Sequence, residues 1–446
     1  MSLTTPQKVQ KLQAALHAKA KGSSDYRFYA LYDKVYRPDV LGFAYRCCKA
    51  NGGAAGVDGR TFADIELYGL DQWLDELTQE LKRKTYCPQA VRRVYIPKDN
   101  GAQRPLGIPT VKDRVIQMAA VLVLDPIFEA DLQPQQYAYR PGRSAHNAVR
   151  HVHKLITSGR DEVLDADLSG YFDEIPHAEL LQSVARRISD GAMLHLIKMW
   201  LEQPVEEADR RGRMQRTTRN RDAGKGTPQG APVSPLLSSV YMRRFVLGWS
   251  VLGHEKRLDA HVVSYADDFV ICCRRGNADE AMVVMRNMMS RLRLPINEQK
   301  TRICKLTPGV AGVSFDFLGY TFGPCWSPNT GRTYYGTRPS KTRIMRFCRK
   351  ISEMTSGRWN GLDDHEMVDR LNRRLIGWSN YFCLGPVNKA YRAIDGHTRY
   401  RLRRWLRKKH MRKGRATSRF PAEYLYEQLG LVRLPHRTAS FPWANA

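Results

Sequence analysis

The stretch His261-Val-Val-Ser-Tyr-Ala-Asp-Asp-Phe-Val-Ile-Cys272 decides the fold. β-Branched and aromatic residues flank Tyr265-Ala-Asp-Asp268 on both sides, which predicts two strands joined by a tight turn. Asp is common in turns, so an ordinary hairpin tip is one interpretation. Two adjacent carboxylates, however, each make ionisation of the other less favourable unless a cation is near. Mg²⁺ prefers such oxygen ligands, so half of a metal site is the other interpretation.

A second apolar segment, Val163-Leu-Asp-Ala-Asp-Leu-Ser-Gly-Tyr-Phe-Asp173, predicts a strand that ends in an acid. If Asp167 lies beside Asp267 and Asp268, three carboxylates can hold two metal ions ~3.5–4 Å apart. That arrangement activates a 3′ hydroxyl and stabilises a leaving pyrophosphate. Asp165 lies two residues earlier and shares the strand face of Asp167, so the pattern alone does not choose between them.

Three stretches carry a resemblance to a known family. Asp167-Leu-Ser-Gly-Tyr-Phe-Asp173, Gly226-Thr-Pro-Gln-Gly-Ala-Pro-Val-Ser-Pro-Leu-Leu237 and Tyr265-Ala-Asp-Asp268 look like motifs A, B and C of a reverse transcriptase. The amino-acid sequences of these motifs resemble those of the group II intron-encoded reverse transcriptase/maturase family, and the resemblance extends over about residues 50–430. The resemblance implies an RNA-directed DNA polymerase (a nucleotidyltransferase). It also implies a maturase that binds its intron RNA to promote splicing and supports mobility by target-primed reverse transcription.

The resemblance further implies roles for single residues, and it aligns Asp167 rather than Asp165 with the ligand. The catalytic residues would be Asp167, Asp267, Asp268 and Lys300, with Lys300 near the departing pyrophosphate as its general acid. Two Mg²⁺ ions, for which Mn²⁺ can substitute, would lie at Asp167, Leu168, Asp267 and Asp268.

The remaining site residues are implied by the same resemblance. The incoming dNTP would contact Lys98, Arg104, Phe172 and Gln229. The Phe172 ring would pack under the sugar and exclude a 2′ hydroxyl, although as a bare residue it fits a hydrophobic core equally well. The primer grip would be Phe317, Leu318 and Gly319. Template and other RNA would contact Arg140, Arg143, Gly230, Pro232, Lys341, Arg343, Arg403, Arg404 and Arg407, since a guanidinium matches phosphate oxygens well.

Composition agrees with a polyanionic partner. The 446 residues carry a net charge of +28, which favours nucleic acid over a membrane surface. No run of 18 apolar residues and no signal-peptide pattern is present in the sequence. Nine cysteines without paired spacing predict free thiols in a reducing cytosol. The family resemblance implies that this is the bacterial cytoplasm or nucleoid. The expected partners are group II intron RNA, an RNA template with its DNA primer, target DNA and dNTPs, with no membrane.

The expected fold class is α+β: a right-hand polymerase whose palm has an antiparallel sheet, followed by an α-helical thumb/maturase domain. The expected domains are an N-terminal helical extension (1–45), fingers (46–150), palm (151–335), thumb (336–415) and a short tail (416–446). Within the palm, residues 205–225 contain a basic stretch that predicts either a solvated loop or an insertion facing RNA. The tail is a candidate for a reduced DNA-binding segment.

Several local expectations follow from residue patterns. Thr61 or Asp64 would begin one helix whose buried stripe runs from Ile65 through Leu67 to Leu81. Ser144 and Ser234 would cap the helices that follow them. Residues 91–98 and 104–109 would pair as a hairpin. The methionines of residues 278–292 lie at helical spacing and are expected in the core.

Three alternatives stay open. The chain could be an RNA-folding maturase only, or a free-standing host-defence or repair reverse transcriptase. The third alternative is an RNA-dependent RNA polymerase, which Phe172 and the sequence Tyr265-Ala-Asp-Asp268 disfavour. The family often ends in an HNH endonuclease held by cysteine pairs, and none follows here. We therefore expect that this chain does not cut target DNA itself.

Overall fold

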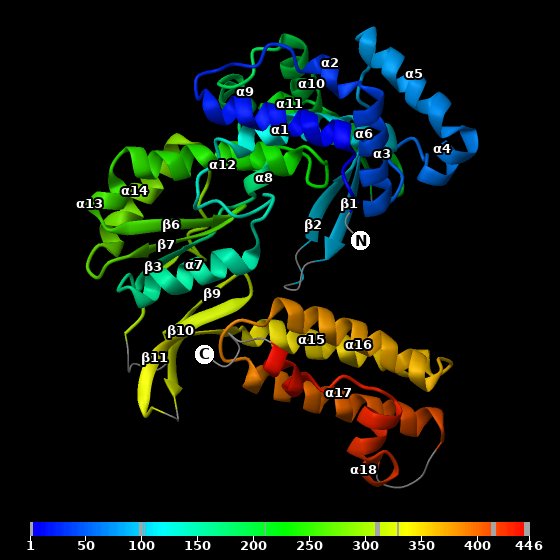
Figure 1. Cartoon of the computed structure of the whole chain (residues 1–446), viewed down its shortest axis with the longest axis vertical. Coiled ribbons are helices and arrows are strands. Elements are labelled where there is room, and N and C mark those ends of the chain that lie inside the picture. Colours follow the sequence, from blue (N-terminus) through cyan, green and yellow to red (C-terminus); the bar gives the residue numbers. More distant parts are fainter. Residues whose placement is uncertain are drawn as a thin grey trace.

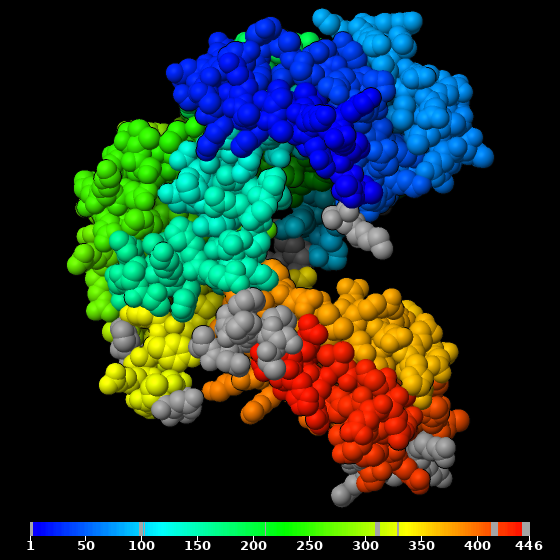
Figure 2. Space-filling model, in the orientation of Figure 1, coloured from blue at the N-terminus to red at the C-terminus, as the bar shows by residue number. Residues whose placement is uncertain are grey.

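The structure is a computed structural model, and it describes residues 3–97, 101, 103–209, 211–307, 313–327, 330–411 and 416–440. It is a mixed α/β protein with a helical C-terminal part (Figure 1). The C-terminal helices have a hydrophobic core of their own, separate from the cores of the preceding residues. The surface is hollowed between these helices and the rest of the chain (Figure 2).

Helix α6 (Val111–Glu129) lies at the centre of the N-terminal part. Its sequence is apolar on nearly every face, and the helix is accordingly buried on nearly every face. Residues 1–45 were expected to be helical, and most of the described ones are; the exceptions are 3–6 before α1, 23–31 between α1 and α2, and 36–37 between α2 and α3. Helices α1 (Gln7–Gly22), α2 (Tyr32–Val35) and α3 (Pro38–Asn51) pack against α6. Helix α5 (Leu70–Lys82) packs against α3 and against α4 (Phe62–Tyr68).

The single helix expected from Thr61 to Leu81 is wrong, because Gly69 divides it into α4 and α5. Gly69 has φ +112°, which only glycine adopts readily, so the helical hydrogen bonds stop there. Thr61 caps α4 and forms a capping box with Asp64, as expected. Leu67, expected in the buried stripe, is 90% exposed, because the break at Gly69 rotates its turn away from the core.

The first sheet combines two hairpins that are distant in sequence. Its strand order is β2-β1-β4-β5, and β1 pairs parallel with β4. The expected hairpin of residues 91–109 is confirmed. The basic stretch of 205–225 is not a plain loop, since it forms a hairpin that extends this sheet and then a short helix. The elements are β1 (Val91–Pro97), β2 (Gln103–Ile108), β4 (Val205–Ala208), β5 (Met214–Thr217) and α11 (Arg219–Ala223).

The central sheet is antiparallel throughout, in the order β6-β7-β3-β8. Both faces are buried: Leu164 and Ile271 belong to the cluster that contains α6 and α12, whereas Val163 and Val270 belong to a second cluster with α7. This explains why the strands read as nearly continuous apolar runs. The strands are β3 (Glu162–Ala166), β6 (Ala260–Tyr265), β7 (Asp268–Cys273) and β8 (Arg302–Lys305).

Helices α12 and α14 lie on one side of the central sheet and α7 lies on the other (Figure 1). Ser144 caps α7 as expected, but Ser234 is the first residue of α12 and its Oγ instead donates a hydrogen bond to the Pro228 carbonyl (2.9 Å). The expected methionine stripe of α14 is confirmed as core. The helices are α7 (Ala145–Thr157), α8 (Tyr171–Glu174), α9 (His177–Ala185), α10 (Gly191–Leu201), α12 (Ser234–Val251), α13 (His254–Arg257) and α14 (Ala278–Arg291).

A third sheet, in the order β11-β10-β9, leads into the C-terminal helices. Among the described helices, none is long and apolar enough to cross a membrane. All nine cysteines are free thiols, as expected. The elements are β9 (Phe315–Phe317), β10 (Tyr320–Ser327), β11 (Arg332–Pro339), α15 (Lys341–Met354), η1 (Gly357–Trp359), α16 (Asp364–Tyr381), α17 (Asn388–Lys409), α18 (Ala416–Arg419), η2 (Tyr424–Gln428) and η3 (Leu434–Ser440).

Candidate active site

The β6–β7 hairpin presents the two adjacent carboxylates at its tip. Tyr265 pairs with Asp268, so Ala266 and Asp267 form the turn. Ala266 adopts φ +58°, a conformation that costs a residue with a Cβ about 1–3 kcal/mol and that clusters at functional sites. The turn therefore stores strain in order to aim these carboxylates.

Strand pairing brings the third carboxylate to the same place. β3 runs antiparallel to β7 with Ala166 opposite Phe269, so Asp167 leaves the sheet beside Asp268. Asp167, Asp267 and Asp268 all line one open cleft of about 1000 Å³. Asp165 does not line it and instead pairs with Arg302 on β8 at 3.6 Å. The structure therefore distinguishes the two acids: Asp167 faces the cleft, and Asp165 is held in an ion pair outside it.

The carboxylates repel one another. Burial of part of the Asp268 carboxyl group, together with the charges of Asp267, Asp167 and Asp165, raises its pKa to about 6. On the other side, the Lys300 Nζ lies 3.1 Å from Asp167 Oδ2 and neutralises that carboxylate. A cation in the cleft would relieve the remaining repulsion.

The donor set fits a hard divalent metal ion, because three carboxylates with unfavourable mutual charge face one open space. Within the described residues, however, no three Asp, Glu, His or Cys side chains already converge closely enough to hold one. Leu168 has an apolar side chain, so only its backbone carbonyl could join such a site. Metal binding would therefore draw Asp167 away from Lys300 or rearrange the pair.

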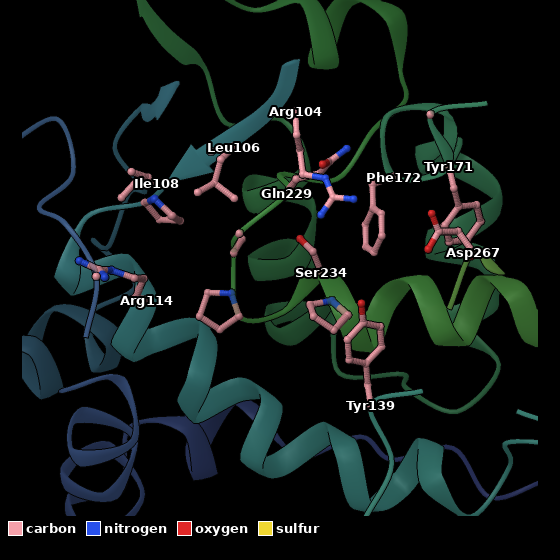
Figure 3. Close-up of a pocket in the computed structure, with 18 of the residues that line it drawn as sticks. Arg104, Leu106, Ile108, Arg114, Tyr139, Tyr171, Phe172, Gln229, Ser234 and Asp267 are labelled. Atoms are coloured by element: carbon pink, nitrogen blue, oxygen red, sulfur yellow. The ribbon is translucent and has the colours of Figure 1, made fainter. Parts of the chain in front are cut away.

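Arg104, Gln229 and Phe172 point into the same space (Figure 3). Arg104 is exposed on β2, and Phe172 is partly buried against the core. The Gln229 Nε2 donates a hydrogen bond to Asp173 Oδ2 at 3.1 Å, which fixes the amide at the edge of the cleft. The fourth predicted nucleotide contact, Lys98, lies outside the described residues.

The glycine loop before α12 packs against β2 rather than leaving open space. Gly230 has φ +114°, and a Cβ there would lie 2.6 Å from the Gly107 carbonyl oxygen. The Gly107 N–H donates a hydrogen bond to the Gln229 carbonyl at 2.6 Å. Gly230 and Pro232 both line the cleft. The close approach that glycine permits is thus, in this structure, an approach to the protein's own strand.

The template role expected for Arg140 does not fit its surroundings. Its side chain is only 5% exposed, and its guanidinium forms a bidentate pair with Glu129. It also donates hydrogen bonds to the carbonyls of Gln133 and Gln136. Arg140 therefore stabilises the segment between α6 and α7 through buried hydrogen bonds. Arg143 is more accessible, and its guanidinium lies over the Tyr137 ring.

The β9–β10 turn expected to grip the primer adjoins the C-terminal helices. Leu318 and Gly319 both have positive φ and form the turn after Phe317. The Arg343 side chain lies against Gly319 and is close enough to Asp268 to lower that carboxyl group's pKa. The first turn of α15, with exposed Lys341 and Arg343, therefore faces the catalytic end of the cleft.

The basic helix α17 is not uniformly available. Arg404 and Arg407 are exposed, which suits a phosphate contact. Arg403 is only partly exposed, and its Nε donates a hydrogen bond to the Phe420 carbonyl at 2.8 Å. Its role is at least partly to hold the segment after α17 in place.

Two cleft residues were missed by sequence reasoning. Tyr139 adopts φ +57°, and its ring projects into the cleft near Arg104 and Phe172 (Figure 3). Arg114 donates hydrogen bonds to the carbonyls of Gly52 and Ala54 and so holds the loop that follows α3 at the cleft wall. No sequence pattern announces a positive φ at a tyrosine, and an arginine at the start of an apolar helix gives only a weak signal.

Comparison with known families finds two matches. Residues 96–322 match the family described as "Reverse transcriptase (RNA-dependent DNA polymerase)". Residues 344–420 match "Group II intron, maturase-specific domain". The first match contains the three carboxylates and most of the residues that line the cleft, and the second covers most of the C-terminal helices.

Individual proteins are also similar. Protein YkfC of Escherichia coli K12 is 31% identical over 348 residues, which are 70% of this chain and 87% of that protein. Group II intron-encoded protein LtrA of Lactococcus lactis is 34% identical over 225 residues, 49% of this chain but 35% of LtrA. Nuclear intron maturase 2 of Arabidopsis thaliana is 31% identical over 94 residues, 21% of this chain and 13% of that protein.

Proposed function

The chain belongs to the family of group II intron-encoded reverse transcriptases with a maturase domain, and we propose that it makes DNA in the cleft that contains Asp167, Asp267 and Asp268. It is an RNA-directed DNA polymerase, and it binds a template–primer and intron RNA. The convergence of three carboxylates, from two parts of the chain about a hundred residues apart, is the observation that carries the proposal.

The reaction we propose is attack of a primer 3′ hydroxyl on the α-phosphate of a dNTP, with pyrophosphate leaving. Two Mg²⁺ ions held by Asp167, Asp267 and Asp268, with the Leu168 carbonyl, would supply the Lewis-acid chemistry. Arg104, with Lys98, would bind the triphosphate. Lys300 would donate a proton to the departing pyrophosphate.

Other residues would shape the nucleotide pocket. Phe172 would lie beneath the sugar and exclude a 2′ hydroxyl, and Gln229 would lie beside the nascent base pair. Competition between dNTP and NTP tests this assignment: a preference for dNTP that the Phe172→Ala variant loses supports it. Equal use of both by the wild-type protein would favour an RNA polymerase instead.

The proposed polymerase activity also implies an assignment of the chain to the parts of a right-hand polymerase. Residues 46–150 would be fingers, 151–335 palm and 336–415 thumb, as in a right hand. The hollow between the C-terminal helices and the rest of the chain would hold the template–primer duplex (Figure 2). Phe317, Leu318 and Gly319 would grip the primer, and Arg143, Lys341, Arg343, Arg404 and Arg407 would contact RNA.

Primer extension on an RNA template with dNTPs and Mg²⁺ tests the site directly. The Asp267→Asn/Asp268→Asn variant should extend no primer and still bind RNA with nearly wild-type affinity, because it loses metal ligands and no phosphate contact. Loss of RNA binding together with extension would remove Asp267 and Asp268 from this role.

Maturase activity is carried by the second matched region. We propose that the intron RNA contacts the basic faces of α15 and α17, and that mobility follows by target-primed reverse transcription at a target DNA. A splicing assay with the same double variant separates the two activities: splicing should survive. If the wild-type protein extends no primer but promotes splicing, an RNA-folding maturase without polymerase activity becomes the better description. A gene without group II intron sequence beside it would favour a free-standing defence or repair enzyme.

A further inference from the structure

A second pocket, which shares no residue with the cleft, contains four arginines. We define the arginine pocket by Arg186, Arg187, Arg243 and Arg244. Its volume is about 320 Å³, and it lies where the end of α9, the middle of α12 and the end of α6 meet. Helices α9 and α12 pack against each other, so the two arginine pairs are held on a common support.

The charges in this pocket are unbalanced. Its only lining carboxylate in the described part of the chain is Asp131, which pairs with Arg187 (Nε to Oδ2, 3.3 Å). Arg187 is 3% exposed and also donates hydrogen bonds to the carbonyls of Ala20, Ser23 and Ser24, so its position is fixed. Asp131 compensates the charge of Arg187, so the guanidinium groups of Arg186, Arg243 and Arg244 have no carboxylate of their own among the described residues that line the pocket.

Arg243 is the second fixed group. Its Nε donates a hydrogen bond to the Asp131 carbonyl at 2.7 Å, and its terminal nitrogens make no further hydrogen bond within the described residues. Burial, and the nearby charges of Arg186 and Arg187, lower the pKa of Arg243. An anion is therefore the missing partner of this group.

Arg186 and Arg244 are exposed at the rim. Guanidinium groups bind phosphate in a bidentate manner, and a phosphate has enough oxygens for several of them, whereas a carboxylate has only two. We propose that the arginine pocket binds a phosphate group, either a free phosphate ion or one phosphodiester of a strand that passes outside the cleft. Arg243 provides the fixed charge, Arg187 holds Asp131 by their ion pair, and Arg186 and Arg244 close over the ligand.

The test compares the full-length protein with two double variants. Arg186→Gln/Arg244→Gln removes both rim cations, which are exposed, so the fold should survive. Lys256→Gln/Arg291→Gln removes two exposed cations from α13 and α14, outside both pockets, and serves as the matched control. Primer extension on a short duplex should be the same in all three proteins, which separates this site from the polymerase cleft.

Two measurements distinguish the sources of phosphate. In the first, the thermal midpoint is compared in sodium phosphate and in sodium chloride at equal ionic strength. A rise in phosphate that only the rim variant loses assigns a free phosphate ligand. In the second, the affinity for poly(U) RNA is followed against salt. Two lost contacts to a single strand should make the negative slope of log K against log salt shallower by about 1.4 in the rim variant, with no change in the control.

Loss of the stabilisation by phosphate supports a free phosphate ligand, and loss of salt dependence in RNA binding supports a phosphodiester ligand. If the rim variant and the control behave alike in both measurements, the arginine pocket holds no phosphate and the proposal is wrong.

Discussion

The Lys300 Nζ lies 3.1 Å from Asp167 Oδ2, although 133 residues separate them. The segment that carries Lys300 holds Asp167 in two further places: the Asn297 N–H donates to the Asp167 carbonyl (2.8 Å), and the Asp167 N–H donates to Thr301 Oγ1 (3.3 Å). The turn before β8 therefore positions Asp167 at the end of β3 and supplies a cation to it. This relationship makes Lys300 both a charge partner of the carboxylates and the nearest candidate proton donor.

Replacing Lys300 should separate these two roles. We expect Lys300→Gln to lower the maximal rate of dNTP incorporation by about 10²-fold, which is typical of losing a general acid. The affinity for template should change little, because no phosphate contact to the template is removed. Lys300→Arg should be as slow, because an arginine keeps the charge but does not give up its proton.

Single-turnover incorporation measures both variants, with Lys256→Gln as the control for loss of a surface cation. Full activity of Lys300→Arg would show that the residue acts by charge alone. Wild-type rates in both variants would remove Lys300 from the site.

The central sheet and its carboxylates could be predicted from sequence, because both depend on local signals. Apolar runs around Tyr265-Ala-Asp-Asp268 and before Asp167 indicate strands, and their order brings the acids together. The break at Gly69 could not be predicted, since a single glycine is often tolerated within a helix and only its φ decides the outcome. Leu67 consequently lies on the surface.

Contacts between distant segments account for the other differences. Whether Arg140 faces nucleic acid or protein depends on where Glu129 lies, and the sequence pattern of Arg140 does not contain that information. The basic stretch looks solvated, yet Val205 and Glu206 on β4 pair with β1, more than a hundred residues earlier, and β5 pairs with β4. The position of Tyr139 in the cleft could not be predicted either, because it follows from a turn that tertiary packing imposes.

The loop at Gly230 allows a test of packing with a well-matched control. Gly230→Ala places a Cβ 2.6 Å from the Gly107 carbonyl oxygen, so the loop or β2 must move. Gly69→Ala has nearly the same φ (+112° against +114°) but meets nothing closer than 3.9 Å. We expect Gly230→Ala to lower the free energy of unfolding by about 1–3 kcal/mol more than Gly69→Ala, the usual cost of overpacking.

Urea unfolding measures that difference, and primer extension should fall in Gly230→Ala alone, because the loop lines the cleft. Equal destabilisation by the two substitutions would mean that backbone strain, rather than the contact with β2, explains the glycine.

Asp125 should make stability depend on pH. Burial, and the charge of Glu129, raise its pKa from 3.8 to about 6, while Arg140 lowers it. The folded protein therefore binds this proton more tightly than the unfolded chain does. The contribution of Asp125 to the free energy of unfolding should rise as the pH falls from above 6 to about 4. At pH 8 the charged carboxylate destabilises the fold.

We expect Asp125→Asn to be more stable than the wild-type protein at pH 8 and to lose this advantage as the pH approaches 4. Chemical unfolding of both proteins across that range measures the difference. A difference that does not change with pH would show that Asp125 titrates normally in the folded protein.

The ion pair of Arg140 and Glu129 gives the last test, which distinguishes a structural arginine from one that binds nucleic acid. Arg140→Ala leaves the Glu129 carboxylate and two backbone carbonyls without their donor, and breaking a buried pair in this way costs about 3–5 kcal/mol. Arg140→Met/Glu129→Leu should recover much of that stability, because no unpaired charge remains. At a temperature where all proteins are folded, RNA binding by the double variant should match that of the wild-type protein. Arg143→Ala should instead make the negative slope of log K against log salt shallower by about 0.7 for a single strand. If Arg140→Ala instead keeps its stability and loses RNA affinity as Arg143→Ala does, the guanidinium turns outward in the complex, and the template role is restored.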